Sequence, residues 1–322
     1  MIAEDWPVVL FKNKSYICNM KVSVPHIVQY QGSKRKLAPQ ILQYIPKKFN
    51  RLIEPFSGMA AISIATAYQQ RTKEFIINDI NPDIISVLQS ATESPNTLID
   101  AYTEVWQEQF TFNGGSEAHY YKVRDDFNNG ERKASYMLYL LARCVKGSVR
   151  YNAEGGFNQS PDKRRNGTSP QTMRNNIYGI SLLLNGKTRF YSKDFREILE
   201  MAKTGDIIYM DPPYQGVSNV RDHRYIAGLS YEEFVLAIEE LRKKNIDFLI
   251  SYDGSLGDKT YGADLPSEFN LIKINLNAGL STQALYLGKK IETIETLYVT
   301  PNLLKNIRLN EEVCYQSELI FV

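Results

Sequence analysis

Four consecutive residues, Asp211-Pro212-Pro213-Tyr214, have the chemistry of a slot for a flat ring that carries an exocyclic amine. The carboxylate of Asp211 and the carbonyl oxygen of Pro212 can each accept a hydrogen bond from an N–H of the amine, and the Tyr214 ring can stack on the flat face. The two prolines keep a helix from starting at this point. The alternative interpretation is a surface turn in which Asp211 only caps a helix.

The segment before this motif predicts where its carboxylate lies. Residues 206–210 form a short β-branched and aromatic run that is typical of a buried strand. Ligands of open α/β sheets bind beyond the carboxyl ends of the strands. We therefore expect Asp211 at a ligand-binding edge of a sheet.

A second segment with binding chemistry, Glu54–Gly58, follows a predicted strand at residues 51–53 and opens a predicted alanine-rich helix at residues 60–68. A strand, a glycine turn and a helix start leave backbone N–H groups free to hold a ligand. The segment lacks the GxGxxG pattern, so a dinucleotide site is disfavoured. The alternative is a tight turn that binds nothing.

Asp79 follows a third predicted strand, at residues 75–77, about 25 residues after the start of the glycine segment. A carboxylate in that position can accept protons from two ribose hydroxyl groups. The alternative is that Asp79 or Asn81 only caps a helix that begins at Pro82. We expect ribose binding.

Taken in order, these motifs resemble those of the Dam-type adenine-N6 DNA methyltransferases, and the resemblance covers residues 29–300. The family's EPFxGxG pattern is matched except at its last glycine, where this chain has Ala60. The resemblance implies that Asp211, Pro212 and Tyr214 are catalytic and that S-adenosyl-L-methionine (AdoMet) is the cofactor. The cofactor-binding residues that it implies are Tyr30, Gly32, Lys34, Glu54, Pro55, Phe56, Ser57, Gly58, Asp79, Ile80, Asp194, Phe195 and Asp211.

The resemblance also implies how some of these residues contact AdoMet. It places Tyr30 and Lys34 against the methionine end of the cofactor. It places Ile80 on the adenine ring and the pair Asp194-Phe195 beside that ring. The alternative for Phe195 is that it is simply the first core residue of its helix.

A basic and polar stretch between Arg143 and Arg174 predicts contact with nucleic acid. It holds seven basic residues against two acidic ones, a local charge of +5, whereas the whole chain carries only +2. Its glycine, asparagine and serine residues are typical of a loop or hairpin, and such a segment with this charge suits phosphate contacts. The alternative is a solvated loop.

Part of this stretch resembles the RYNxxGxFN segment of Dam-type enzymes, which leads into their DNA-contacting hairpin. Arginine and asparagine side chains suit hydrogen bonds with base edges. A purely structural hairpin is the alternative. The predicted DNA-binding residues are Arg150, Asn152, Asn158, Lys163, Arg164 and Arg165.

Composition argues against several other classes of protein. No apolar run in the 322 residues approaches the roughly 20 residues of a membrane span, and the first residues lack the pattern of a signal peptide. The three cysteines lie far apart without metal-ligand spacing, which fits a reduced, cytoplasmic setting. None follows a proline, so the nucleophile used to methylate cytosine at carbon 5 is missing. Three separated histidines do not indicate a zinc site.

The alternation of predicted strands and helices indicates an α/β fold with a doubly wound, mostly parallel sheet, as the resemblance to AdoMet methyltransferases of Rossmann-like fold also implies. Residues 36–45 have helical spacing as well. The alternation breaks at residues 106–186, which predicts an inserted, mainly helical and hairpin lobe that recognises the DNA target. We expect a leader at 1–24 and an AdoMet-binding catalytic domain at 25–105 and 187–322.

The predicted function is site-specific methylation of the exocyclic N6 of an adenine that is flipped out of double-stranded DNA. Direct transfer from AdoMet needs neither a metal nor a covalent enzyme intermediate. Cytosine-N4 methylation stays open as an alternative, as does a non-catalytic DNA-binding module with a vestigial AdoMet fold. The expected partner is double-stranded DNA, with a separately acting restriction endonuclease as a further option. We expect a monomer or weak dimer without membrane contact.

Overall fold

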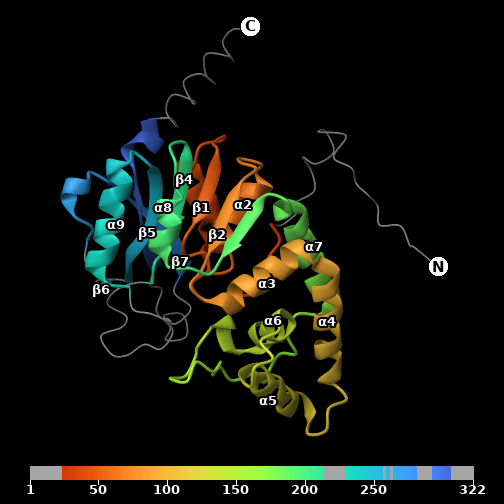
Figure 1. Cartoon of the computed structure of the whole chain (residues 1–322). Coiled ribbons are helices and arrows are strands. Elements are labelled where there is room, and N and C mark those ends of the chain that lie inside the picture. The colour runs from red at the N-terminus through yellow and green to blue at the C-terminus, as the bar shows by residue number, and fades with distance from the viewer. Residues whose placement is uncertain (1–23, 214–228, 257–258, 262–263, 281–291, 306–322) are drawn as a thin grey trace.

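A computed structural model describes residues 24–213, 229–256, 259–261, 264–280 and 292–305 (Figure 1). In these residues one sheet runs through the molecule with strand order β3-β2-β1-β4-β5-β8-β7, and the short β6 pairs with β5. Strands β3, β2, β1, β4 and β5 are parallel, and β8 is antiparallel to both of its neighbours. The strands are β1 (Arg51–Glu54), β2 (Phe75–Asn78), β3 (Thr188–Tyr191), β4 (Asp206–Met210), β5 (Asp247–Leu256), β6 (Lys259–Tyr261), β7 (Ile272–Leu280) and β8 (Glu292–Val299).

The central strands supply side chains to two hydrophobic cores, one on each face of the sheet. In β4, Ile207 and Tyr209 belong to one core, whereas Ile208 and Met210 belong to the other. Alternate side chains of a strand point to opposite faces, so a strand that is covered on both sides is apolar at nearly every position. For this reason the short apolar runs predicted the parallel strands correctly, and the α/β fold is confirmed.

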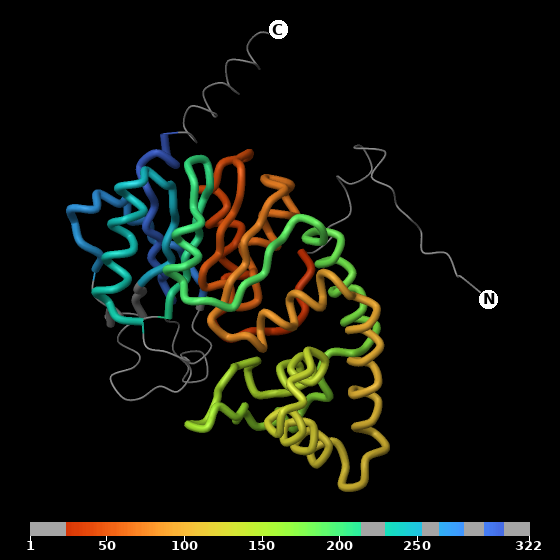
Figure 2. Tube along the Cα trace, in the orientation of Figure 1, coloured from red at the N-terminus to blue at the C-terminus, as the bar shows by residue number. Residues whose placement is uncertain are grey.

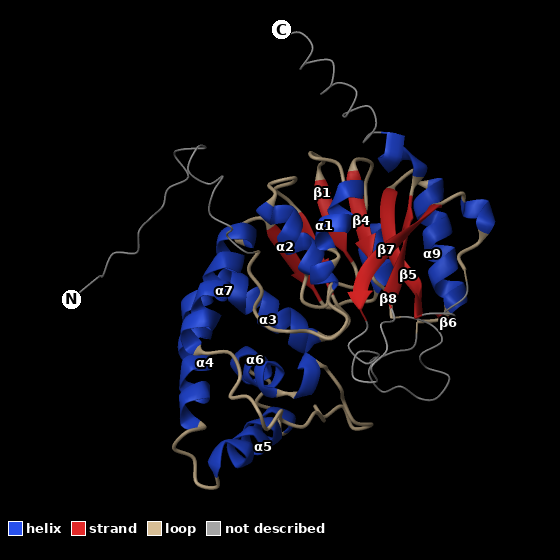
Figure 3. Ribbon diagram, turned by 180° about the vertical axis from the view of Figure 1, so that it is seen from behind, coloured by secondary structure: helices blue, strands red, loops and turns tan. Residues whose placement is uncertain are grey.

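Helices cover both faces of this sheet (Figures 1 and 3). Helices α2, α3 and α7 contribute to one core, and α8 and α9 contribute to the other. The helices are α1 (Ala38–Ile41), α2 (Ala61–Tyr68), α3 (Pro82–Glu93), α4 (Pro95–Glu108), α5 (Gly115–Asn128), α6 (Ala134–Arg143), α7 (Pro170–Leu184), α8 (Phe195–Glu200) and α9 (Tyr231–Lys243).

The helix expected at residues 36–45 is broken into three short pieces. The structure has a 3-10 turn at Lys34–Lys36, then α1, then a 3-10 turn at Leu42–Tyr44. Pro39 lies in the first turn of α1, which is the part of a helix that tolerates a residue without a backbone N–H. The prediction of one continuous helix was therefore wrong, although the same apolar side chains are buried.

Helices α5 and α6 and the segment 144–169 lie beyond the carboxyl ends of the parallel strands (Figures 2 and 3). Helix α4 contacts both α6 and α7, and α7 also contacts α3 beside the sheet. This arrangement places a mainly helical region on the side of the sheet where ligands are expected. The sequence pattern did not locate α5 and α7 individually, and the domain boundaries stay a prediction.

Candidate active site

Three acidic side chains from distant parts of the chain lie at neighbouring strand ends. Glu54 is the last residue of β1, Asp79 follows β2, and Asp211 follows β4. Strand β1 pairs with both β2 and β4, so it lies between them in the sheet. The sequence predicted all three positions, whereas Tyr214 lies outside the described residues.

Asp211 is held by a buried lysine. The Lys34 Nζ lies 2.8 Å from Asp211 Oδ1 and 3.4 Å from Glu295 Oε2, and only 5% of the Lys34 side chain is exposed. Burial raises the pKa of Asp211 to about 6, the Lys34 charge opposes this rise, and the Glu295 charge adds to it. Lys34 thus lies directly beside the predicted catalytic motif, and it also contacts the carbonyl oxygen of Gly32 at 3.4 Å.

Glu295 is a site residue that the sequence analysis did not identify. It lies on β8, more than 80 residues beyond Asp211 in the chain, and its side chain is 24% exposed. No local pattern marks it, because its place beside Lys34 depends on β8 pairing with β5.

Glu54 is buried beneath the start of α2. Its Oε2 accepts hydrogen bonds from the backbone N–H of Ser63, at 3.0 Å, and from the Ser63 hydroxyl. Ala60, at the helix N-cap, offers no capping side chain, so Glu54 satisfies a donor of the first turn in its place. Burial raises the pKa of Glu54 to about 8, with the charge of Asp211 as a further cause. Its predicted contact with AdoMet stays a prediction.

Asp79 fixes the turn that follows β1. Its two carboxylate oxygens accept the backbone N–H of Gly58 and of Asn81, each at 2.9 Å. The cap of α3 is instead Asn81, whose side chain accepts the backbone N–H of Asp83. Burial raises the pKa of Asp79, and the two N–H groups oppose that rise. Ile80 beside it exposes 45% of its surface, which suits an apolar contact with a ring.

The glycine turn depends on Gly58 for two reasons. Its φ is +47°, and a Cβ there would lie 2.9 Å from Cε1 of the Tyr30 ring. The departure from the family pattern at Ala60 is also visible, because Ala60 has φ 54°. A left-handed conformation costs a non-glycine residue about 1–2 kcal/mol, so this chain accepts backbone strain where the family has glycine.

Asn78 connects the loops that follow three strands. Its Nδ2 donates to the carbonyl oxygens of Pro55, at 2.9 Å, and Lys193, at 3.0 Å. Its Oδ1 accepts the backbone N–H of Lys193, and its own carbonyl accepts the N–H of Ser57. This buried residue was not predicted from the sequence, although it directly precedes Asp79.

The pair Asp194-Phe195 lies at the start of α8. Asp194 caps this helix through the backbone N–H of Arg196 and also pairs with the Arg196 guanidinium at 2.7 Å, which lowers its pKa. Phe195 is buried, and its ring lies 5.2 Å from that of Phe56 and 6.3 Å from that of Phe234. Both residues therefore have structural partners, and their contact with AdoMet stays a prediction.

Residues 150–158, which include the predicted DNA-binding residues Arg150, Asn152 and Asn158, form a tight hairpin that we call the recognition hairpin. Asn152 and Gly156 bond through their backbones at 2.8 Å, and Asn158 donates its N–H to the carbonyl of Arg150 at 2.8 Å. The side-chain oxygen of Asn152 accepts the N–H of Gly156 at 2.7 Å. The side chains of Arg150, Asn152 and Asn158 are exposed.

The basic loop that follows is organised by Asp162. This buried carboxylate accepts the backbone N–H of Arg164 at 3.1 Å and pairs with Arg164 Nε at 3.0 Å and Arg165 Nε at 3.1 Å, which holds its pKa well below the usual range. Lys163 pairs with Glu117 on α5 at 3.0 Å. Arg143 is buried and donates to the carbonyl of Arg165. The local charge of +5 therefore overstates what faces solvent.

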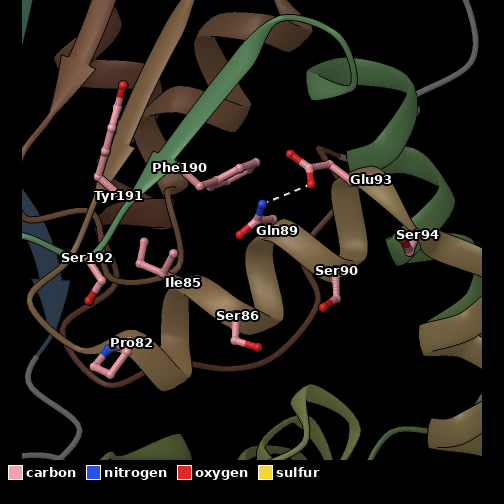
Figure 4. A pocket seen from close by; sticks show the side chains of 10 residues that line it. All are labelled: Pro82, Ile85, Ser86, Gln89, Ser90, Glu93, Ser94, Phe190, Tyr191 and Ser192. Carbon is pink, nitrogen blue, oxygen red and sulfur yellow. Dashed lines mark hydrogen bonds between the residues drawn. The ribbon is translucent and has the colours of Figure 1, made fainter.

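A separate hollow of about 430 Å³ lies between α3 and β3 (Figure 4). Its wall includes Gln89 and Glu93, which bond to each other at 2.9 Å. None of its lining residues belongs to the predicted cofactor or catalytic set. The three carboxylates, rather than this hollow, mark the candidate active site.

The charges of this site fit a cationic ligand. Burial raises the pKa values of Glu54, Asp79 and Asp211, while Lys34 brings one buried positive charge. A bound cation would stabilise the ionised carboxylates. AdoMet carries a sulfonium, an ammonium and one carboxylate, together with ribose hydroxyl groups that can donate hydrogen bonds to a carboxylate such as that of Asp79. The residues present therefore fit AdoMet.

Two further properties hold for the part of the chain that the structure describes. No group of three or more histidine, cysteine, aspartate or glutamate side chains there could hold a metal ion. None of its helices combines the length and the apolar character that crossing a bilayer would need.

Comparison with known proteins agrees with this geometry. Residues 30–278 match the model of the D12 class N6 adenine-specific DNA methyltransferases. A type II methyltransferase, M1.LlaDCHI of Lactococcus lactis subsp. cremoris, is 27% identical over 293 residues, which are 86% of this chain and 97% of the relative.

Two further relatives match shorter parts. A DNA N-6-adenine-methyltransferase of Escherichia phage P1 is 28% identical over 71% of this chain, but the match covers only 30% of the phage protein. A DNA adenine methylase of Escherichia coli (strain K12) is 26% identical over 59% of this chain and 65% of its own length. The family match spans well over half of the chain and includes the ends of β1, β2 and β4. The chain therefore belongs to the D12 class N6 adenine-specific DNA methyltransferases, which use AdoMet to methylate N6 of adenine in DNA.

Proposed function

We propose that Asp211 and the carbonyl oxygen of Pro212 accept hydrogen bonds from the two amino N–H groups of the target adenine and so orient its lone pair toward the methyl donor. Support comes from the place of Asp211 at the end of β4 and from its buried contact with Lys34. An adenine in duplex DNA reaches such a site only by leaving the base stack. Tyr214 would stack on the extruded base.

Lys34 keeps Asp211 ionised in this proposal. A protonated carboxyl group accepts fewer hydrogen bonds and cannot offset the positive charge that develops on the amino nitrogen. The ammonium at 2.8 Å opposes the effect of burial on the pKa of Asp211. At neutral pH, above a pKa of about 6, most of Asp211 is then charged.

AdoMet supplies a methyl group that is already activated by the sulfonium centre. The chain has to bind and position the two reactants, and correct positioning alone accounts for a large part of such a rate increase. Asp79 would accept hydrogen bonds from the ribose hydroxyl groups, and Ile80 would cover the adenine ring. Gly58 leaves room for Tyr30 at the edge of this site.

The exposed part of the segment 144–169 is proposed to contact DNA. Arg150, Asn152 and Asn158 would bond with base edges. The loop Lys163–Arg165 would contact phosphates. Support comes from the exposure of these side chains and from their location beyond the carboxyl ends of the strands.

The relative from Lactococcus lactis is named a type II methyltransferase. On that ground we propose that this chain modifies one short DNA site and protects it from a restriction endonuclease that acts separately. The test is to express the chain in a host without DNA methylation and to map modified bases in the genomic DNA. N6-methyladenine confined to one short sequence is expected. Only N4-methylcytosine, or no modified base although the protein binds AdoMet, would overturn the proposal.

A further inference from the structure

Tyr151 joins the recognition hairpin to the loop that carries Asp79. The residue lies between Arg150 and Asn152, yet its own side chain is only 8% exposed. Its ring packs against Phe157 on the opposite side of the hairpin, at 6.1 Å between centroids. Its hydroxyl points away from the hairpin and donates to Asp83 Oδ2 at 2.6 Å.

The hydroxyl of Tyr151 lies at the start of α3, next to the loop that carries Asp79. Asn81 lies 3.1 Å from it through Nδ2 and 3.2 Å through Oδ1. Asn81 also donates its backbone N–H to Asp79, the residue assigned to the ribose. Asn81 and Asp83 are both about 6% exposed. A short buried series of hydrogen bonds thus runs from Asp79 to the hairpin.

Arg132 supports the same connection from a second direction. Its Nη1 lies 2.8 Å from Asp83 Oδ2, and its Nη2 donates to the carbonyl of Gly155 in the hairpin turn at 2.7 Å. The buried carboxylate of Asp83 therefore has two partners, the Arg132 guanidinium and the Tyr151 hydroxyl. Tyr151 belongs to the recognition hairpin, and Arg132 bonds with it through Gly155. Buried polar groups in such a network hold their partners in a defined geometry.

We propose that Tyr151 is a positioning residue that couples cofactor binding to DNA binding. The inference rests on the proposed function, in which Asp79 binds the ribose of AdoMet and the hairpin binds DNA. A ligand on Asp79 orders the loop of Asp79, Asn81 and Asp83, and through Tyr151 it orders the hairpin. DNA bound to Arg150 and Asn152 has the reverse effect. Each ligand therefore lowers the ordering cost that the other must overcome.

Coupling of this kind is reciprocal: the factor by which the cofactor strengthens DNA binding equals the factor by which DNA strengthens cofactor binding. We expect a factor of about 10 for the wild-type protein, which corresponds to about 1.4 kcal/mol. The probes are S-adenosylhomocysteine, which cannot react, and a duplex that carries the modified site found by genomic mapping. Calorimetry gives the affinity for each probe alone and with the other bound.

Tyr151→Phe is the decisive variant because it keeps the packed ring and removes only the hydroxyl. We expect its coupling factor to fall to about 1–2. A factor of this size means no coupling, since coupled sites typically change each other's affinity about 5-fold or more. Tyr120→Phe is the matched control. Tyr120 is also buried, and its hydroxyl donates to the carbonyl of Gln159 next to the hairpin at 3.0 Å, so it bonds with the DNA-binding region and not with Asn81 or Asp83. This control should keep the wild-type coupling factor even if its DNA affinity drops.

Arg132→Met gives a second test if Tyr151→Phe unfolds, since it keeps an unbranched side chain over Phe127 and loses both polar links. A reduced factor in this variant supports the inference. The inference is overturned if the wild type shows no coupling, if Tyr151→Phe retains it, or if Tyr120→Phe loses it equally. Failure of the wild type to bind S-adenosylhomocysteine or DNA would instead contradict the proposed function.

Discussion

Replacement of Lys34 by methionine should move the pH dependence of methyl transfer. The ammonium of Lys34 lies 2.8 Å from Asp211 and 3.4 Å from Glu295. Methionine has a similar length and no charge, so it fills the same buried space. Among the described residues, the other titratable groups that act on Asp211 are Glu54 and Glu295, and both are acidic. The pKa of Asp211 must therefore rise in this variant.

The size of the effect follows from the pKa of Asp211, which is about 6 with Lys34 in place. An adjacent opposite charge lowers a carboxyl pKa by about 1–3 units, so the variant should have a pKa of roughly 7–9. At pH 7 the ionised fraction would fall from about nine tenths to between about one half and one hundredth. The turnover number kcat should fall in proportion, by roughly 2–100-fold, and should recover as the pH rises to about 9.

The assay is tritiated methyl transfer to DNA with both substrates saturating, measured across neutral and alkaline pH. Lys36→Met is the matched control, because Lys36 belongs to the same 3-10 turn and its side chain is exposed. Its profile should match that of the wild type. The reasoning would be refuted if kcat of Lys34→Met fell at the same acidic pH as kcat of the wild type. An equal loss at every pH would refute it as well, since that would mean that Lys34 does not act through the ionisation of Asp211.

Three further predictions concern single groups of residues. Asp79→Ala should weaken AdoMet binding by about 1.5–3 kcal/mol. Unchanged affinity by calorimetry in a folded variant would mean that Asp79 only accepts its hydrogen bonds from Gly58 and Asn81 and does not bind the cofactor. Glu54 has a folded-state pKa of about 8, above its usual value of 4.5, so between these pH values the folded protein holds a proton that the unfolded chain releases. The free energy of unfolding of the wild type should therefore fall as the pH rises through this range, by up to about 1.4 kcal/mol per pH unit. Glu54→Gln should reduce this fall, and parallel curves of stability against pH for the two proteins would contradict the prediction. Neutralising Lys163, Arg164 and Arg165 together should weaken binding to all DNA sequences and lower the slope of log affinity against log salt by about one unit for each lost phosphate contact, whereas an unchanged slope would leave them as a solvated loop.

The sequence predicted the sheet and the acidic residues at its edge because both depend on local patterns. Apolar runs such as β2 and β4 are buried on both faces, so their side chains have little choice of environment. A carboxylate directly after such a run must lie at the carboxyl edge. The positions of Asp79 and Asp211 could therefore be predicted from the sequence alone.

The contacts that tune these carboxylates could not be predicted in the same way. Lys34 was expected at the methionine end of AdoMet, but the residues next to it in the sequence do not predict its contact with Asp211. That contact, like the approach of Glu295, depends on segments that are far apart in the chain. Asp162 was counted only as an acid in a basic stretch, although it fixes Arg164. Pairing across the fold, rather than composition, decides these cases.

The proposal that Asp211 binds and orients the target amine is tested most directly by measuring methyl transfer in Asp211→Ala. Tritiated methyl transfer to duplex DNA with the modified site should be measured beside the affinity for S-adenosylhomocysteine on the same preparations. Loss of an acceptor that stabilises developing charge should lower kcat by about 100-fold or more, with cofactor affinity largely retained. Transfer within a few-fold of the wild-type rate would contradict the account.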